Sequence, residues 1–224
     1  MSEWRQSIER FVRTHLPSAP ARVLEFGCGD GELALALDRA GYDVVAIDPE
    51  APDGPIFVRT TLEEFDEGRS FDAVVGIVVL HHIHDLDAGL HKIGTLVKGP
   101  APVVLAEFAW EHLDAATLQW CAERLPSETA GSWLAGMIER ARTAASEPGA
   151  LSADAVRRWA GEEGIHSYEE MRPALDRHLS PRHFDWAAYL FDDLANTSER
   201  DELQAISAGD IRPVGFRYVG AKKG

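Results

Sequence analysis

Basic residues and cysteines are both scarce in this chain of 224 residues. Lysine and arginine number 22 against 37 acidic residues, which gives a formal net charge of −15 at pH 7. So acidic a surface repels phosphate backbones, and no basic patch beyond the terminal Lys222 and Lys223 offsets it, so we expect no nucleic-acid partner. The two cysteines, Cys28 and Cys121, are too few for a disulfide scaffold and fit a reducing compartment.

Long apolar runs are also lacking. The longest, residues 73–80, is far too short to cross a bilayer. The first residues, MSEWRQSIERF, are charged and amphipathic, unlike a signal peptide. We therefore expect a cytoplasmic protein with no membrane partner.

What the first half of the chain does contain is a regular alternation of apolar and amphipathic segments. Apolar segments covered on both faces are typical of parallel strands, and their alternation with helices predicts a doubly wound α/β sheet. Only residues 49–55, with three prolines, separate the second and third strands, so a stiff loop is expected in place of the usual crossover helix. The predicted strands are 22–26, 43–48, 56–59, 71–80 and 102–108, and the predicted helices are 3–15, 32–40 and 85–97.

The second half of the chain is mostly helical in pattern. Helices are predicted over 114–125 and 129–145 and from Ser152, and a Ser-x-x-Glu capping box at Ser167 begins another that Pro173 interrupts early. Strands are predicted over 182–190 and 211–219. No linker is long enough to separate independent domains, so residues 1–224 are expected to form one. Its parts are an N-terminal helix (1–20), a cofactor-binding half (21–108), a helical insertion or lid (109–180) and closing strands (181–224).

The strongest motif is VLEFGCGDG at residues 23–31, followed by AID at 46–48. Its glycines lie between a predicted strand and a predicted helix, and an acid, Asp48, ends the next strand. That context is the one a nucleotide-binding turn requires. The dinucleotide fingerprint needs a glycine at the sixth position from Gly27, where this chain has Glu32, and Glu25 precedes the first glycine by two residues.

In this pattern, Glu-x-Gly-x-Gly-x-Gly followed by Asp48, the chain resembles the class I S-adenosylmethionine-dependent methyltransferases that act on small molecules. The segment from Phe71-Asp72 to Asp85 and the closing GFRYVG extend the resemblance. It implies a Rossmann-like, doubly wound, mostly parallel seven-stranded α/β sheet with an antiparallel closing strand. Here the sheet would have a shortened strand 2–strand 3 crossover and a helical lid. It also implies the cofactor S-adenosylmethionine and methyl transfer to a small-molecule acceptor.

The resemblance assigns cofactor contacts to individual residues. Asp48 would accept hydrogen bonds from the ribose hydroxyls, and Glu25 would lie near the cationic amino group of the methionine end. Adenine recognition falls on Thr61 and Leu62, and because Thr61 departs from the usual aspartate, backbone groups would carry it. Ile77 and Val78 would contact the sulfonium side of the cofactor, and core packing is their alternative role. The candidate cofactor-binding residues are Glu25, Phe26, Gly27, Cys28, Gly29, Gly31, Asp48, Pro49, Thr61, Leu62, Ile77 and Val78.

The segment VLHHIHD, residues 79–85, places three histidines beyond the fourth strand. They lack the i,i+4 spacing of a helical metal site, so no metal is expected, although His82 and His84 on one face leave a three-ligand site as an alternative. Ligands of open α/β sheets bind at this edge. His81 is therefore the candidate general base, or a residue that shapes the pocket, and Glu107 is a weaker catalytic candidate. Asp85 is expected to cap the next helix.

Two other functions remain open from the sequence. One is a non-catalytic module that binds S-adenosylmethionine or S-adenosylhomocysteine, and the other is an NAD-dependent oxidoreductase. Further acceptor-side candidates follow the fifth strand, each with core packing as its alternative role. They are Trp110, His112, Trp133, Met137 and Tyr189.

Overall fold

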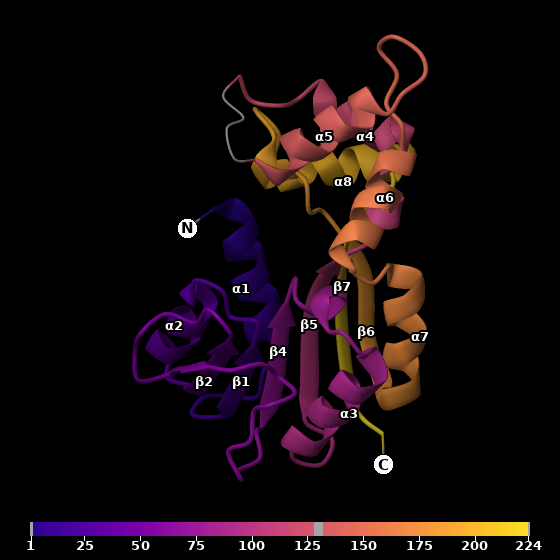
Figure 1. Ribbon diagram of the computed structural model, residues 1–224. Coiled ribbons are helices and arrows are strands. Elements are labelled where there is room, and N and C mark those ends of the chain that lie inside the picture. The colour runs from indigo at the N-terminus through magenta and orange to yellow at the C-terminus, as the bar shows by residue number, and fades with distance from the viewer. Residues whose placement is uncertain (1, 128–131, 224) are drawn as a thin grey trace. The chain divides into compact units, whose positions relative to one another are not determined.

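A computed structural model describes residues 2–127 and 132–223. Its strands form one seven-stranded sheet in the order β3-β2-β1-β4-β5-β7-β6 (Figure 1). The sheet begins with the buried run that precedes the glycine-rich turn. The strands are β1 (Arg22–Phe26), β2 (Asp43–Asp48), β3 (Phe57–Arg59), β4 (Ala73–Ile77), β5 (Pro102–Phe108), β6 (Leu179–Ala187) and β7 (Gly215–Lys222).

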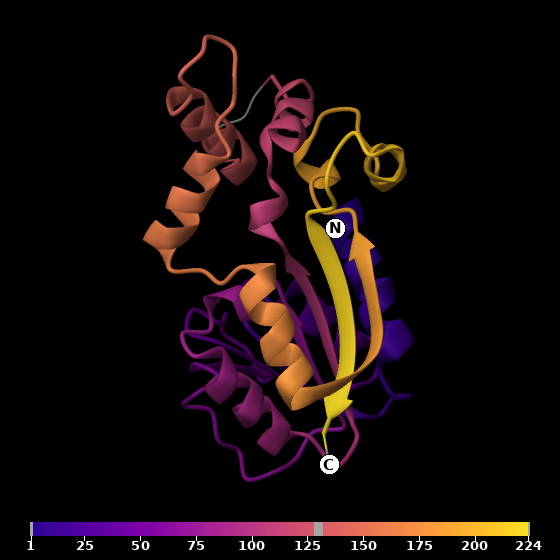
Figure 2. The ribbon, with the colours of Figure 1, turned by 90° about the vertical axis from the view of Figure 1, so that its right-hand side faces the viewer.

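The first five strands pair in parallel, as their apolar composition predicts. β1 lies between β2 and β4, with Phe26 opposite Ile47 on one side and Gly76 on the other. All five residues of β1 are buried, so this strand is covered on both faces. Figure 2 shows β7 running opposite to β6, which confirms the predicted antiparallel closing strand.

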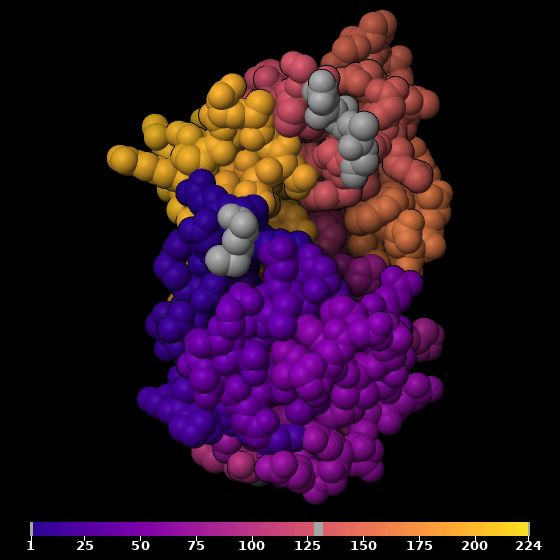
Figure 3. All heavy atoms as spheres, turned by 90° about the vertical axis from the view of Figure 1, so that its left-hand side faces the viewer, coloured from indigo at the N-terminus to yellow at the C-terminus, as the bar shows by residue number. Residues whose placement is uncertain are grey.

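Helices α1 (Glu3–His15), α2 (Glu32–Arg39), α3 (Leu86–Leu96) and α7 (Tyr168–His178) accompany this sheet. The Asp85 side chain accepts the Ala88 N–H at 3.0 Å, which confirms the predicted cap of α3. No helix lies between β2 and β3, as the proline-rich residues 49–55 predict. In Figure 3 the indigo and purple residues from the first part of the chain form one continuous surface.

The chain divides into two compact units. We call residues 5–107, 169–185 and 217–223 the sheet unit, and residues 2–4, 108–168 and 186–216 the helical unit. Strands β5, β6 and β7 contribute residues to both units. The helical unit contains α4 (Ala115–Ala122), α5 (Trp133–Thr143), α6 (Asp154–Glu163) and α8 (Glu199–Ala208), with short 3₁₀ turns η2 (Trp110–His112) and η3 (Phe191–Asp193). That residues 109–180 act as a lid stays a prediction.

Several sequence predictions were wrong in detail. β4 ends at Ile77 rather than at residue 80, because Val78 adopts a positive φ of 53° and a 3₁₀ turn, η1 (Leu80–His82), follows. α7 continues through Pro173, whose neighbours Met171 and Ala174 are buried, so packing holds the helix across the proline.

The later elements also differ from their predicted bounds. β6 begins three residues before the predicted 182, so the helical insertion ends at residue 178, and β7 begins four residues after the predicted 211. α8 was not predicted; a capping box of Ser198 and Asp201 begins it. Residues 129–131 of the predicted helix 129–145 lie outside the described residues. None of the described helices is long and apolar enough to span a bilayer.

Candidate functional site

The glycine-rich turn joins β1 to α2 and needs its glycines for two reasons. Gly27, Gly29 and Gly31 have φ values of 67°, 51° and 76°, a left-handed conformation that side chains disfavour. A methyl group on Gly27 would also overlap the Val79 side chain, and one on Gly31 would lie 2.5 Å from the Phe57 ring. Close packing of the turn against Val79 and Phe57 therefore requires glycine at these two positions.

Asp48 ends β2 and ties the glycine-rich turn to the loop that follows this strand. Its Oδ2 accepts the Gly29 N–H at 3.1 Å, and its Oδ1 accepts the Glu50 N–H at 2.8 Å. The Gly27 N–H also donates to the Ile47 carbonyl at 2.8 Å. These bonds hold the Asp48 carboxylate at the carboxyl edge of the sheet.

A cavity of about 260 Å³ opens in the sheet unit beside Asp48. Six predicted cofactor residues line it: Phe26, Gly27, Asp48, Pro49, Thr61 and Leu62. Six further residues that the sequence did not predict also line it: Ile47, Thr60, Glu63, Val79, His82 and Ile83. Thr60 and Glu63 lie on either side of the predicted pair Thr61 and Leu62, so their positions in the sequence could have identified them. Val79, His82 and Ile83 come from the turn after β4, whose course depends on tertiary contacts.

Glu25 is buried beneath the glycine-rich turn, and no cationic side chain pairs with it in the part of the chain that the structure describes. Its side chain is 3% exposed, and its Oε2 has no hydrogen-bond partner in the structure. Burial, together with the nearby charges of Asp30 and Asp48, raises the pKa of Glu25 to about 8. The charged form of such a buried carboxyl is stabilised by a cationic group, such as the amino group of a methionine-derived cofactor. The residues present therefore fit S-adenosylmethionine.

The remaining predicted cofactor residues do not line this cavity. Cys28 is buried, and burial raises the pKa of its thiol to about 12, so it stays protonated at neutral pH. Ile77 and Val78 lie at the end of β4. Val78 donates its N–H to the Ala106 carbonyl at 2.8 Å and holds a positive φ, which is costly for a branched side chain. This backbone turns the chain from β4 toward the cavity.

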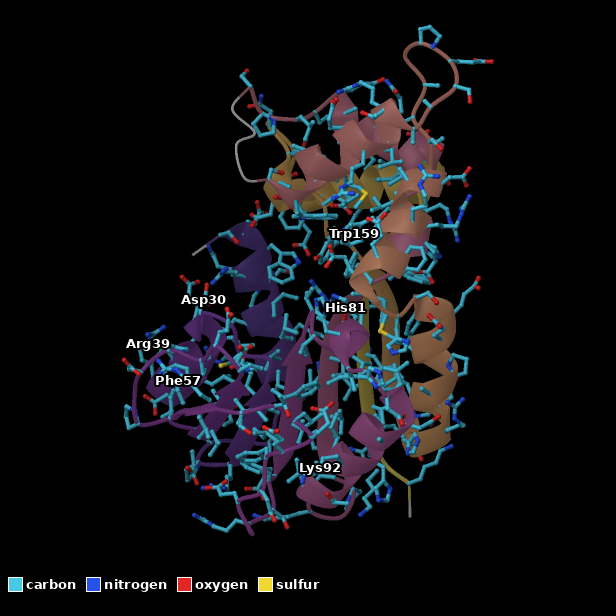
Figure 4. The ribbon with its side chains drawn as sticks, in the orientation of Figure 1. Asp30, Arg39, Phe57, His81, Lys92 and Trp159 are labelled. Atoms are coloured by element: carbon cyan, nitrogen blue, oxygen red, sulfur yellow. The ribbon has the colours of Figure 1, made fainter. Side chains whose placement is uncertain are left out.

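The turn after β4 is organised by a buried carboxylate and a buried histidine. Glu107 Oε1 accepts the N–H groups of Val79, at 2.7 Å, and Leu80, and its Oε2 lies 2.7 Å from His81 Nδ1. Glu107 is 1% exposed and His81 is 2% exposed. The exposed neighbour His82, not His81, lines the cavity. Figure 4 labels His81 near this end of β4.

The other acceptor-side candidates belong to the helical unit. Trp110 Nε1–H donates to the His166 carbonyl at 3.1 Å, and His112 Nδ1 lies 2.6 Å from the Pro213 carbonyl. Burial lowers the pKa of His112. Met137 is buried. In the part of the chain that the structure describes, no group of three or more His, Cys, Asp or Glu residues could hold a metal ion.

Comparisons with known proteins identify the family and the fold. A family model described as a methyltransferase domain matches residues 1–136. A ubiquinone biosynthesis O-methyltransferase of Rhodopseudomonas palustris is 35% identical over 136 residues, covering 48% of this chain and 54% of the relative. The chain spans about half the length, or less, of the first such relatives.

Solved structures share the fold at low identity. An S-adenosylmethionine-dependent methyltransferase from Mesorhizobium loti superposes with a TM-score of 0.60 at 14% identity, covering 99% of this chain and 98% of that one. The N-methyltransferase NodS from Bradyrhizobium japonicum, in complex with S-adenosylhomocysteine, gives 0.55 at 13% identity, covering 100% and 89%. At these identities the likeness concerns the fold alone.

Proposed function

This chain belongs to the methyltransferase domain family, whose model it matches over residues 1–136, and on that premise we propose that it transfers a methyl group from S-adenosylmethionine to a small-molecule acceptor. The observation that carries the proposal is a pair of carboxylates on adjacent parallel strands. Glu25 is buried, and its Oε2 has no hydrogen-bond partner among the described residues, whereas Asp48 is held at the cavity by two backbone N–H groups. One carboxylate suits a cationic amino group and the other suits the hydroxyls of a ribose.

The proposal gives each part of the site a task. When bound, S-adenosylmethionine supplies an electrophilic methyl group on a sulfonium. Asp48 would hold the ribose, Glu25 would pair with the ammonium, and the wall formed by Thr61 and Leu62 would hold the adenine. The glycine-rich turn, Cys28 and Pro49 would supply backbone contacts, and Ile77 and Val78 would shape the sulfonium side.

We assign His81 and Glu107 a positioning task. Glu107 holds the backbone of Val79 and Leu80, and His81 faces the same carboxylate. This pair stabilises the conformation of the turn in which Val79 and His82 line the cavity. Because His81 is 2% exposed, a base role would require the turn to open so that the acceptor could reach the imidazole. The His81→Asn comparison in the Discussion separates the two roles.

Calorimetry with S-adenosylhomocysteine, followed by a screen with labelled methyl donor, tests the proposal. We expect saturable binding and methyl transfer to at least one member of a panel of phenols, amines, thiols and carboxylates. Absence of binding at millimolar concentration would overturn it. Binding without transfer to any acceptor would favour the non-catalytic module instead.

The proposal also concerns the compartment in which the protein acts and the partners that it has there. A net charge of −15 disfavours nucleic acid, and both cysteines are free and buried. We place the protein in the cytoplasm, acting on a freely diffusing acceptor. Cell fractionation with an antibody to the native chain checks this placement.

A further inference from the structure

Four aromatic rings from distant parts of the sequence meet in the helical unit. Tyr189 stacks on Phe108, with ring centroids 5.3 Å apart and planes 9° from parallel. Trp4 lies edge-on to Tyr189 at 5.9 Å, and Trp133 lies 6.1 Å from both Phe108 and Tyr189. We call these four residues the aromatic cluster. Its perpendicular and stacked rings present π faces in more than one direction.

The aromatic cluster differs from the protein's ordinary core. Phe216 and Tyr218 of β7 are 1% and 0% exposed, whereas Trp4, Trp133 and Tyr189 are only half-buried. Rings that keep part of their surface accessible are available to a ligand. Three of the four cluster residues therefore keep part of their surface accessible, whereas Phe108 is 4% exposed.

A carboxylate without a cation adjoins the aromatic cluster. Trp133 Nε1–H donates to Asp193 Oδ2 at 2.9 Å. Among the described residues, no cationic side chain pairs with Asp193. Burial, together with the neighbouring charge of Asp192, raises the pKa of Asp193. A cationic ligand would stabilise the charged form of Asp193, as we infer for Glu25 in the sheet unit.

The turn that carries Tyr189 and Asp193 is held by one buried side chain. Glu202 of α8 is fully buried, and its carboxylate accepts the N–H groups of Tyr189, Leu190 and Phe191 at 2.9, 2.8 and 2.8 Å. Three bonds to one carboxylate fix the turn before any ligand arrives. Such preorganisation is typical of binding sites, because it lowers the entropy lost on binding.

We propose that the aromatic cluster and Asp193 form a subsite in the helical unit for a small molecule that carries a cationic ammonium group. π faces together with a carboxylate are the combination that recognises ammonium ions. The inference goes beyond the proposed methyl transfer and concerns the helical unit alone.

Choline and its uncharged isostere 3,3-dimethylbutan-1-ol provide the test, with tryptophan fluorescence as the signal. Full-length wild-type protein should bind choline about tenfold more tightly than the isostere. Asp193→Asn should weaken choline binding by about tenfold without changing isostere binding. Asp192→Asn is the matched control, because it removes the same charge from the exposed neighbouring residue. Its choline affinity should stay within about twofold of wild type.

Equal affinity for choline and the isostere, no binding of either, or equal effects of the two aspartate variants would overturn the subsite. Tyr189→Leu, checked for folding by circular dichroism, provides a second variant and should also weaken choline binding. S-adenosylhomocysteine affinity is measured on the same samples. If it binds while choline does not, the subsite fails and the methyltransferase proposal stands; if choline alone binds, the reverse holds.

Discussion

His81 Nδ1 lies 2.7 Å from Glu107 Oε2, and both side chains are buried. Through its other oxygen, Glu107 also holds the backbone N–H groups of Val79 and Leu80. The path of the chain after β4 therefore depends on one carboxylate at the end of β5. It follows that the loop lining the cavity is set by a contact between residues 26 positions apart.

Glu107→Gln should lower the free energy of unfolding by about 2 kcal/mol, because charge-assisted hydrogen bonds to a buried group are lost. Urea unfolding measures this loss. His84→Ala, at an exposed neighbouring histidine, should change stability by less than about 0.5 kcal/mol.

His81→Asn separates a positioning role from a base role. The asparagine amide can still donate to Glu107 but cannot accept a proton at neutral pH. If His81 only positions the turn, His81→Asn retains turnover and its pH profile, whereas His81→Ala loses turnover with cofactor affinity nearly intact. Loss of turnover in both variants, with unchanged S-adenosylhomocysteine affinity, would assign His81 the base role.

Asp48→Ala should weaken S-adenosylhomocysteine binding by about 1–3 kcal/mol, because charged hydrogen bonds to the ribose are lost. Asp38→Ala, which removes the same side chain from the exposed face of α2, is the control and should leave the affinity unchanged. Calorimetry measures both. Equal affinities for the two variants would refute the ribose assignment.

Glu25 should give up a proton when the cofactor product binds. With a pKa raised to about 8 by burial, it is mostly protonated at pH 7, and a bound ammonium favours its charged form. Calorimetry of S-adenosylhomocysteine binding in buffers of different ionisation enthalpy should show release of up to one proton in wild type. Glu25→Gln, which cannot ionise, should lose this release.

The same carboxyl makes stability depend on pH. Its folded-state pKa lies above the ordinary value of 4.5, so the folded state holds the proton that the unfolded state has lost between about pH 4.5 and 8. Its contribution to the free energy of unfolding therefore falls as pH rises through this window, by at most about 1.4 kcal/mol per pH unit. Glu25→Gln should flatten that part of the urea-unfolding profile, and an unchanged slope would contradict the assignment.

Gly27→Ala and Gly29→Ala form a matched pair in the glycine-rich turn. Both residues have positive φ, so each substitution should cost about 1 kcal/mol of backbone strain. Only Gly27→Ala adds a methyl group that overlaps Val79, whereas the space at Gly29 is open. Thermal unfolding should therefore show a loss for Gly27→Ala that exceeds the loss for Gly29→Ala by about 1–3 kcal/mol.

Local sequence signals were enough to predict the parallel half of the sheet and the glycine-rich turn. β1, β2 and β5 have the predicted bounds because each is an apolar run that ends at a glycine, an acid or a loop. The missing crossover helix follows from three prolines within seven residues. These are local signals, carried by residues close together in the chain.

Tertiary structure decided the rest. Residues 78–80 are as apolar as β4 itself, so the sequence does not show where the strand ends. The hydrogen bonds of Glu107 fix the turn that follows it. Because of this turn, His81 lies in the interior and His82 lines the cavity, whereas the sequence predicted His81 at the pocket. The aromatic cluster likewise joins residues 4, 108, 133 and 189, whose meeting no local pattern encodes. Such contacts depend on long-range packing, which a hydrophobic pattern permits but does not specify.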